Sequence, residues 1–229
     1  MKNISAAVVI LASMMMFGCA TVQQAPLALS EDFYSSGDKV VGVYVDELPK
    51  TDTHLVGASC LLCMAAASMA NSSLTDHIRS LNTDELSGLN KSVARVVSGK
   101  GVKVNPISAP IDISKLGKFK SDGANFAEKD FRPLKDRLNV DKLIVIDLNT
   151  VGAYRPYSSY VPTGDPVGTV TGQAYTVDLA TNKYELYEGI DFKVSVQGEW
   201  DEPPAFPGVT NAYFQAIELT KDKIVSLFQ

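Results

Sequence analysis

Short apolar runs, separated by polar turns, predict most of the secondary structure of this chain. The valine-rich run 39–45 ends at a polar turn containing Pro49 and predicts a first, buried strand. The run 102–107 predicts a second strand, which Pro106 places at a sheet edge because proline cannot donate a ladder hydrogen bond. The run 143–148 is apolar at nearly every position and therefore predicts a central strand.

The last third of the chain has the pattern of an antiparallel hairpin followed by a helix. Over 166–179, residues such as threonine, glutamine and tyrosine on one face alternate with glycine, valine and alanine on the other. A polar turn at 180–183 leads into a return strand over 184–196. Apolar residues at helical spacing then predict a final helix over 211–228. Because one face of the first hairpin strand carries only glycine, valine and alanine, we expect this helix to pack closely on that face.

Two further helices are predicted between the first strands. Asn82 can cap a helix whose apolar residues recur at three- and four-residue steps, and which ends at Gly99 and Gly101. A shorter helix is predicted over 130–138, with its end at Asn139. The resulting order is β, apolar insert, α, β, α, β, β, β, α.

The apolar insert, residues 55–70, consists mainly of alanine, leucine, methionine and cysteine and contains no charged residue. Its residues are helix formers, so we expect a short helix or a helical hairpin. A helix that is hydrophobic on all sides is either buried or bound to something, and this one is too short to span a membrane. One interpretation is a membrane-contacting or oligomerising element.

These elements predict an α/β (α+β) fold with a single mixed β-sheet of about five strands and packed helices. The chain has 229 residues, of which 45% are hydrophobic and 21% charged, a composition typical of a globular protein. Residues 37–229 are long enough to bury a sizeable core, and they predict one domain without an internal repeat.

The first 18 residues have the three parts of a secretory signal peptide: a basic start, an apolar stretch over 6–16 and a small residue at the cut. The sequence MFGC at 16–19 resembles the cleavage site of a bacterial lipoprotein. This resemblance implies that cleavage leaves Cys19 as the mature N-terminus, with acyl chains on its thiol and its amine. The alternative is an ordinary cleaved signal in which Cys19 is incidental.

A lipoprotein of this kind is anchored to a membrane, because several acyl chains together hold a protein essentially permanently. Ala20, which follows the cysteine, implies by the same resemblance that the protein is sorted to the periplasmic face of the outer membrane. Residues 19–36 are then expected to comprise the acylated cysteine and a flexible tether, since they are rich in glutamine, alanine, proline and serine.

Charge and motifs exclude several classes of function. The formal net charge is −5 and no block of lysine or arginine occurs, so we expect no nucleic-acid partner. The hydrolase elbow, the zinc-protease helix motif, the P-loop and the dinucleotide fingerprint are all missing from the sequence. We therefore expect a protein that is not an enzyme and needs no cofactor.

The predicted hairpin also carries a resemblance to known envelope proteins. Residues 174–185 read AYTVDLATNKYE, an apolar strand, an aspartate, a Thr/Asn turn and an aromatic return strand. This stretch resembles the corresponding hairpin in the amino-terminal domain of TolB, in the curli secretion lipoprotein and in the outer-membrane lipoproteins that activate penicillin-binding proteins. The resemblance implies a small α/β domain whose partner is another envelope protein.

Cys60 and Cys63 form a C-x-x-C pair at the expected start of a helix. Such pairs carry out thiol–disulfide exchange when the helix start lowers the pKa of the first thiol. The favoured alternative is a structural disulfide, because an oxidising compartment promotes one. With His54 and His77 the cysteines could also form a metal set, but the spacing is not that of a zinc finger, so we expect no metal.

Two aromatic, proline-rich segments, 154–162 and 200–207, are expected to be loops. Aromatic and arginine side chains dominate binding hot spots, and prolines reduce the ordering cost of association. One interpretation is therefore a partner-binding surface; the other is that the loops fold back over the sheet edge as a lid. The candidate surface residues are Arg155, Tyr157, Tyr160, Trp200 and Phe206. The identity of the partner and the oligomeric state are not predicted.

Overall fold

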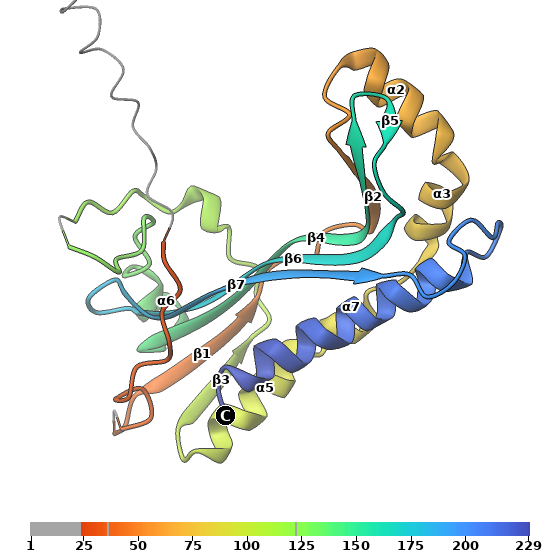
Figure 1. Cartoon of the computed structure of the whole chain (residues 1–229). Helices are drawn as coiled ribbons and strands as arrows, with labels where there is room; N and C mark the ends of the chain where they lie inside the picture. Colours follow the sequence, from red (N-terminus) through yellow and green to blue (C-terminus); the bar gives the residue numbers. More distant parts are fainter. Residues whose placement is uncertain (1–23, 36, 122) are drawn as a thin grey trace, which may run out of the picture.

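The computed structural model describes residues 24–35, 37–121 and 123–229. The expected signal peptide and the expected acylation site, Cys19, lie outside the described residues. The described chain forms one open mixed sheet, with an arm that rises from one end of it (Figure 1). This arrangement confirms the predicted fold class.

The strands and helices follow one another in the predicted order, with additions. The strands are β1 (Val40–Val45), β2 (Asp52–Val56), β3 (Lys103–Ile107), β4 (Lys142–Ser158), β5 (Val161–Pro162), β6 (Val167–Asp178) and β7 (Lys183–Ser195). The helices are α2 (Leu61–Ala70), α3 (Ser72–Ser80), α4 (Asp84–Ser87), α5 (Leu89–Gly99), the 3-10 turn η1 (Ile113–Lys115), α6 (Leu134–Leu138) and α7 (Pro207–Ser226).

The order of strands across the sheet is β3-β1-β4-β6-β7. Strand β1 is parallel to both β3 and β4, whereas β4, β6 and β7 are successively antiparallel. Strand β3 lies at the edge, as Pro106 predicts, and β4 is central, as its apolar run predicts.

Strands β1 and β2 follow one another along the same side of β4. Val41 pairs with Lys142, and Asp52 pairs with Gly152, so β2 continues along β4 where β1 ends. Between these two pairings, the β4–β6 register shifts at Asn149, and a bulge of this kind bends a strand. The last part of β4 leaves the plane of the sheet together with β2 (Figure 1).

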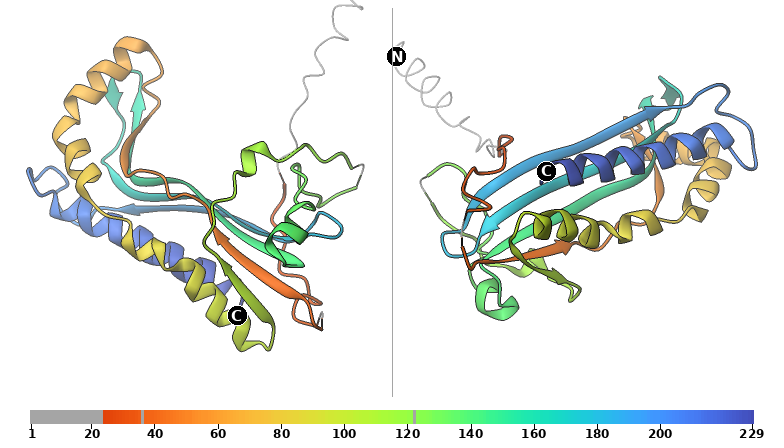
Figure 2. Two further views of the ribbon diagram at one scale, coloured as in Figure 1. Left: turned by 180° about the vertical axis from the view of Figure 1, so that it is seen from behind. Right: turned by 90° about the horizontal axis from the view of Figure 1, so that it is seen from below.

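Helices α5 and α7 cover one face of the sheet (Figure 2). They bury the main core against β1, β4, β6 and β7, and α7 packs on the face of β6 that carries Gly168, Val170 and Ala174. The close packing expected for the last helix is thereby confirmed. The opposite face is covered at the end away from the arm by segments 108–121 and 123–133 and by α6.

The described part of the expected tether packs on the domain. Leu27 N donates to Tyr187 O at 2.8 Å, and Phe33 is completely buried. The buried Lys142 Nζ lies 2.8 Å from Glu185 Oε1 and 4.6 Å from the centre of the Phe33 ring. Apolar burial, the backbone pairing of Leu27 with Tyr187 and the contact of Lys142 with Phe33 therefore hold the segment 24–35 against the sheet, although its composition suggests a free tether.

Four points of the sequence-based prediction need correction. The helix expected from Asn82 is divided at Gly88 into α4 and α5, and only the second half of the helix expected over 130–138 forms, after Pro133. Strand β2 was not predicted, since an isolated five-residue segment has too weak a pattern. The expected loop 154–162 belongs largely to β4 and β5, because β2, β5 and β6 supply hydrogen-bonding neighbours.

Candidate functional site

The arm consists of residues 52–80 and 152–165, and its end exposes an unusual number of large apolar side chains. Leu61 is 87% exposed, Leu62 is 81% exposed and Tyr160 is 68% exposed. Within the described chain, every exposed large apolar residue except Leu219 belongs to this arm. We call the group the apolar tip: Val56, Leu61, Leu62, Met64, Met69, Tyr160 and Val161.

The apolar tip is also free of charge. The two segments that form it, 56–75 and 156–164, contain no aspartate, glutamate, lysine or arginine. Figures 1 and 2 both place α2 beside the β4–β5 hairpin at the end of the arm. A contiguous exposed apolar patch is a feature of interaction sites.

Helix α2 is held to the arm by a narrow stripe of residues. Of its ten residues only Cys63 and Ala67 are buried, and they pack with Ala58 and Tyr157. The stripe continues through Asn71 to α3. Because so little of α2 faces inward, most of the surface of Leu61, Leu62 and Met69 is exposed.

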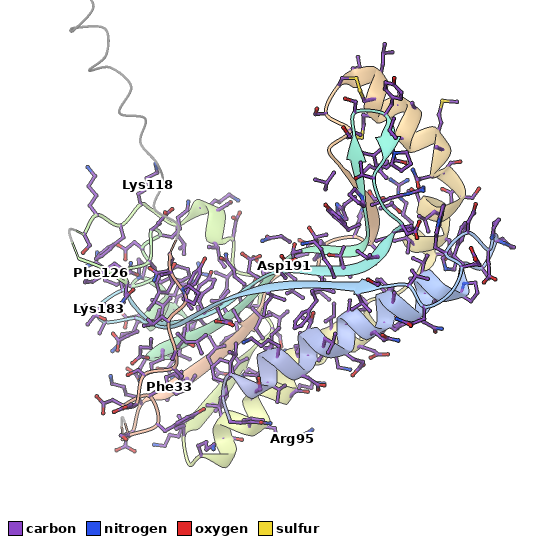
Figure 3. The ribbon with its side chains drawn as sticks, in the orientation of Figure 1. Phe33, Arg95, Lys118, Phe126, Lys183 and Asp191 are labelled. Carbon is purple, nitrogen blue, oxygen red and sulfur yellow. A yellow bond between two sulfur atoms is a disulfide. The ribbon has the colours of Figure 1, made fainter. Side chains whose placement is uncertain are left out.

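A disulfide between Cys60 and Cys63 closes the first turn of α2, near the end of the arm (Figure 3). Cys60 is exposed and caps the helix, because its Sγ accepts a hydrogen bond from Cys63 N at 2.9 Å. The preceding turn contains Gly57, whose φ of +99° brings the backbone against Tyr157 O. Together these features fix the entry of the chain into α2.

A cluster of buried and half-buried side chains joins the two segments of the arm and contacts Trp200, which lies outside the arm. Arg155 Nη1 donates to Asn71 Oδ1 at 2.6 Å, and Asn71 Nδ2 donates to Tyr157 Oη at 2.7 Å. The Arg155 guanidinium also lies 4.2 Å from the centre of the Trp200 ring. We call these four residues the arm joint. Arg155 forms no salt bridge with any carboxylate among the described residues, so the amide and the rings stabilise its charge.

The arm joint contains three of the five residues that were predicted to form a binding surface, namely Arg155, Tyr157 and Trp200. Arg155 and Tyr157 are buried, and Trp200 is half-buried beneath the guanidinium. Phe206 is buried at the start of α7, where its ring lies 5.6 Å from that of His77. Only Tyr160 lies on the exposed surface, so the five candidates do not form one binding surface. The burial of most of them favours the alternative, in which the loops fold back over the sheet as a lid.

The histidines lie at the base of the arm and hold no metal set. His77 Nε2 lies 2.7 Å from Thr210 Oγ1, and burial lowers the pKa of His77, which keeps the imidazole neutral at pH 7. Cys60 and Cys63 are bonded to each other. In residues 24–35, 37–121 and 123–229, no three His, Cys, Asp or Glu side chains gather as metal ligands would.

The sequence alone does not decide whether Leu61, Leu62, Met64 and Met69 are buried or exposed. Their only sequence signal is the absence of charge over a helix-forming segment, which is compatible with burial as well as with exposure. Among the described helices, none is both long enough and apolar enough to cross a membrane.

Comparisons with known proteins leave the family of this chain open. No protein-family model matches the sequence, and no curated protein matches it. Among solved structures, a dodecamer of PelC from Paraburkholderia phytofirmans resembles it with a TM-score of 0.30 and 10% sequence identity, over 90% of this chain and 96% of that chain. A similarity at this TM-score assigns neither a family nor a function to this chain.

Proposed function

We propose that this protein is a lipid-anchored, non-catalytic binding module of the bacterial cell envelope, and that the apolar tip contacts another envelope protein. The observation that supports the proposal is the exposure of α2, an uncharged helix of which only two residues are buried. Burial of apolar surface against a partner is favourable by roughly 25 cal/mol per Å². The tip therefore has a driving force for association that the rest of the described surface lacks.

The chemistry of the tip favours a protein over a bilayer as the partner. Elements that lie on a membrane surface usually combine an apolar face with lysine and arginine for the lipid headgroups. The tip segments 56–75 and 156–164 contain neither residue. Methionine and tyrosine with few charged residues are, in contrast, typical of the centre of a protein–protein interface.

The membrane anchor is the second part of the proposal, and the lipoprotein-like sequence at 16–19 supports it. Acylation at Cys19 would confine the protein to a membrane and so raise the local concentration of the tip near an envelope partner. Metabolic labelling with a radioactive fatty acid should label the protein and should fail to label the Cys19→Ser variant. Equal labelling of the wild-type protein and the variant, or no labelling of either protein, would refute the proposed membrane anchor.

Replacing Leu62 with aspartate is expected to reduce partner capture at least roughly ten-fold, since it places a charge in the centre of an apolar contact. The stability of the isolated protein should change little, because Leu62 is 81% exposed. Capture is measured by photocrosslinking in intact cells, with a photoreactive phenylalanine at position 61 and identification of the adduct.

Leu219→Asp is the matched control for this prediction. Leu219 is also an exposed leucine, but it lies on α7, outside the arm. It should leave the yield of the adduct unchanged. An adduct that forms equally in the Leu62→Asp variant would refute the role of the tip, and an adduct with lipid alone or with a second copy of this chain would replace the proposed partner.

A second candidate function is thiol–disulfide exchange at Cys60 and Cys63. It is favoured by the exposure of Cys60 at the N-terminus of α2, where the helix would stabilise a thiolate. If the disulfide is structural instead, the Cys60→Ser, Cys63→Ser double variant should loosen α2 by up to about 2 kcal/mol, the chain-entropy value for a four-residue loop. Hydrogen exchange of the α2 amides measures this loosening.

Reduction of insulin by dithiothreitol separates the two roles of the cysteines. For a structural disulfide, the wild-type protein should accelerate the reaction no more than the double variant does. Acceleration by the wild type that disappears in the Cys60→Ser single variant would establish exchange activity and would contradict the non-catalytic proposal.

A further inference from the structure

A cavity of about 610 Å³ opens on the face of the sheet opposite α5 and α7. It lies between the sheet and the segment that contains Phe126, at the end away from the arm (Figure 3). It is therefore separate from the apolar tip and from the arm joint. Its size is within the usual range for a small-molecule site.

Three tyrosines from β6 and β7 form one wall of this cavity. Tyr175 and Tyr187 are opposite each other on neighbouring strands, and their ring centres are 6.1 Å apart in a stacked arrangement. The Tyr184 ring lies edge-on to both, with its centre 5.6 Å and 5.2 Å from theirs. Burial raises the pKa of Tyr175 and of Tyr184, so both phenols are neutral at physiological pH.

The hydroxyl of Tyr175 is a polar group that lacks a partner. Tyr187 Oη donates to Gln173 Oε1 at 2.5 Å, and Tyr44 Oη donates to Asp46 Oδ1 at 2.9 Å. Tyr175 is 4% exposed and lines the cavity, yet its hydroxyl has no hydrogen-bond partner within the described residues. The hydroxyl oxygen is not among the fully buried unpaired atoms, so it is open to the cavity. A ligand in the cavity can therefore form a hydrogen bond with it.

The cavity lining also contains two acidic side chains and one basic side chain, so its net charge is negative. Asp147 and Glu128 line it, and neither forms a salt bridge with a basic group of the described chain. Gln173 Nε2 donates to Asp147 Oδ2 at 3.0 Å and so holds that carboxylate in place. The one cationic side chain in the lining, Lys129, donates instead to Ser114 O at 2.7 Å and to Leu116 O at 3.3 Å.

We propose that this cavity binds an organic cation that carries a protonated amine. Aromatic ring faces attract cations, and carboxylates form strong charge-assisted hydrogen bonds with ammonium groups. An ammonium group can donate both to Asp147 and to the vacant acceptor on Tyr175. The same carboxylates repel anions, and a neutral ligand would leave their charge uncompensated.

Equilibrium dialysis of the full chain in a nonionic detergent tests this proposal with radiolabelled 1,4-diaminobutane. Labelled 1,4-butanediol is the neutral probe of the same length. The diamine is expected to bind saturably and the diol at least ten-fold more weakly. Asp147→Asn should weaken diamine binding roughly ten- to hundred-fold and Tyr175→Phe roughly three- to ten-fold, the ranges for a charged and a neutral hydrogen bond.

Asp191→Asn is the control, because Asp191 is an exposed aspartate on β7 that pairs with Lys193 at 2.7 Å and does not line the cavity (Figure 3). It should leave diamine binding unchanged. Equal binding of the two probes, no saturable binding of the diamine, or an equal loss in Asp191→Asn and Asp147→Asn would each overturn the proposal. None of these outcomes bears on the apolar tip.

Discussion

Replacing Gly168 with alanine is expected to lower the free energy of unfolding by about 3 kcal/mol or more, the upper range for overpacking a core. A Cβ at Gly168 would overlap the carbonyl group of Ala212 and come within 2.5 Å of Tyr213 N. Both are backbone atoms of α7, so no side chain can move aside; the helix itself must shift. Chemical denaturation followed by circular dichroism measures the change.

The reason for so large an effect is the position of α7 over the main core. Tyr213 and Ile217 of this helix are completely buried against the sheet. A shift that relieves the overlap at Gly168 separates these side chains from β6 and β7 together. The cost therefore includes lost packing in addition to local strain.

Gly189→Ala is the matched control, because Gly189 lies on the neighbouring strand β7 and a Cβ there meets no atom within 4 Å. Both substitutions restrict the unfolded chain equally, so the difference between them isolates the contact with α7. The Gly189 variant should be as stable as the wild type or slightly more stable. Similar stability of the two variants would show that α7 can shift without cost.

Replacing Arg155 with alanine is expected to loosen the arm by about 3 kcal/mol. Hydrogen bonds to charged groups contribute about 1.5–3 kcal/mol and a desolvated cation–π contact up to about 2 kcal/mol, and the two are not fully additive. The variant removes the donor to Asn71 and the cation over Trp200. Amide hydrogen exchange in α2 and α3 should accelerate, while exchange in α5 should remain slow.

Loosening of the arm should also weaken partner capture, since the apolar tip loses its fixed position. Arg79→Ala is the control, because Arg79 is an exposed arginine of the same arm, paired with Asp52 at 3.1 Å. Exposed ion pairs contribute little to stability, so exchange and capture should stay near wild-type values. If Arg155→Ala behaves like this control, the arm joint does not hold the arm.

The two proposed sites differ in how much the sequence reveals about them. The apolar insert 55–70 is visible as an uncharged helix-forming segment, and its composition already suggests an element that contacts a membrane or another protein chain. The cavity is not visible in this way. Its tyrosines belong to β6 and β7, whereas Glu128 comes from a distant segment and Asp147 from β4.

The hydrophobic pattern of the sequence by itself determined the order of the main elements, the central position of β4, the edge position of β3 and the packing of α7 on the small-residue face of β6. These properties depend on side-chain periodicity and on local backbone restrictions, which every segment carries with it. Gly168 illustrates this point. A glycine is needed at this position of β6 because the backbone of α7 lies close to that face.

Only the tertiary structure decided which aromatic and apolar side chains are exposed. Arg155 and Tyr157 became the buried arm joint because Asn71 and Trp200, distant in the sequence, lie over them. Leu61 and Leu62 became exposed because α2 meets the arm through Cys63 and Ala67 alone. Burial depends on what long-range neighbours cover, and that information is absent from any single segment of the chain.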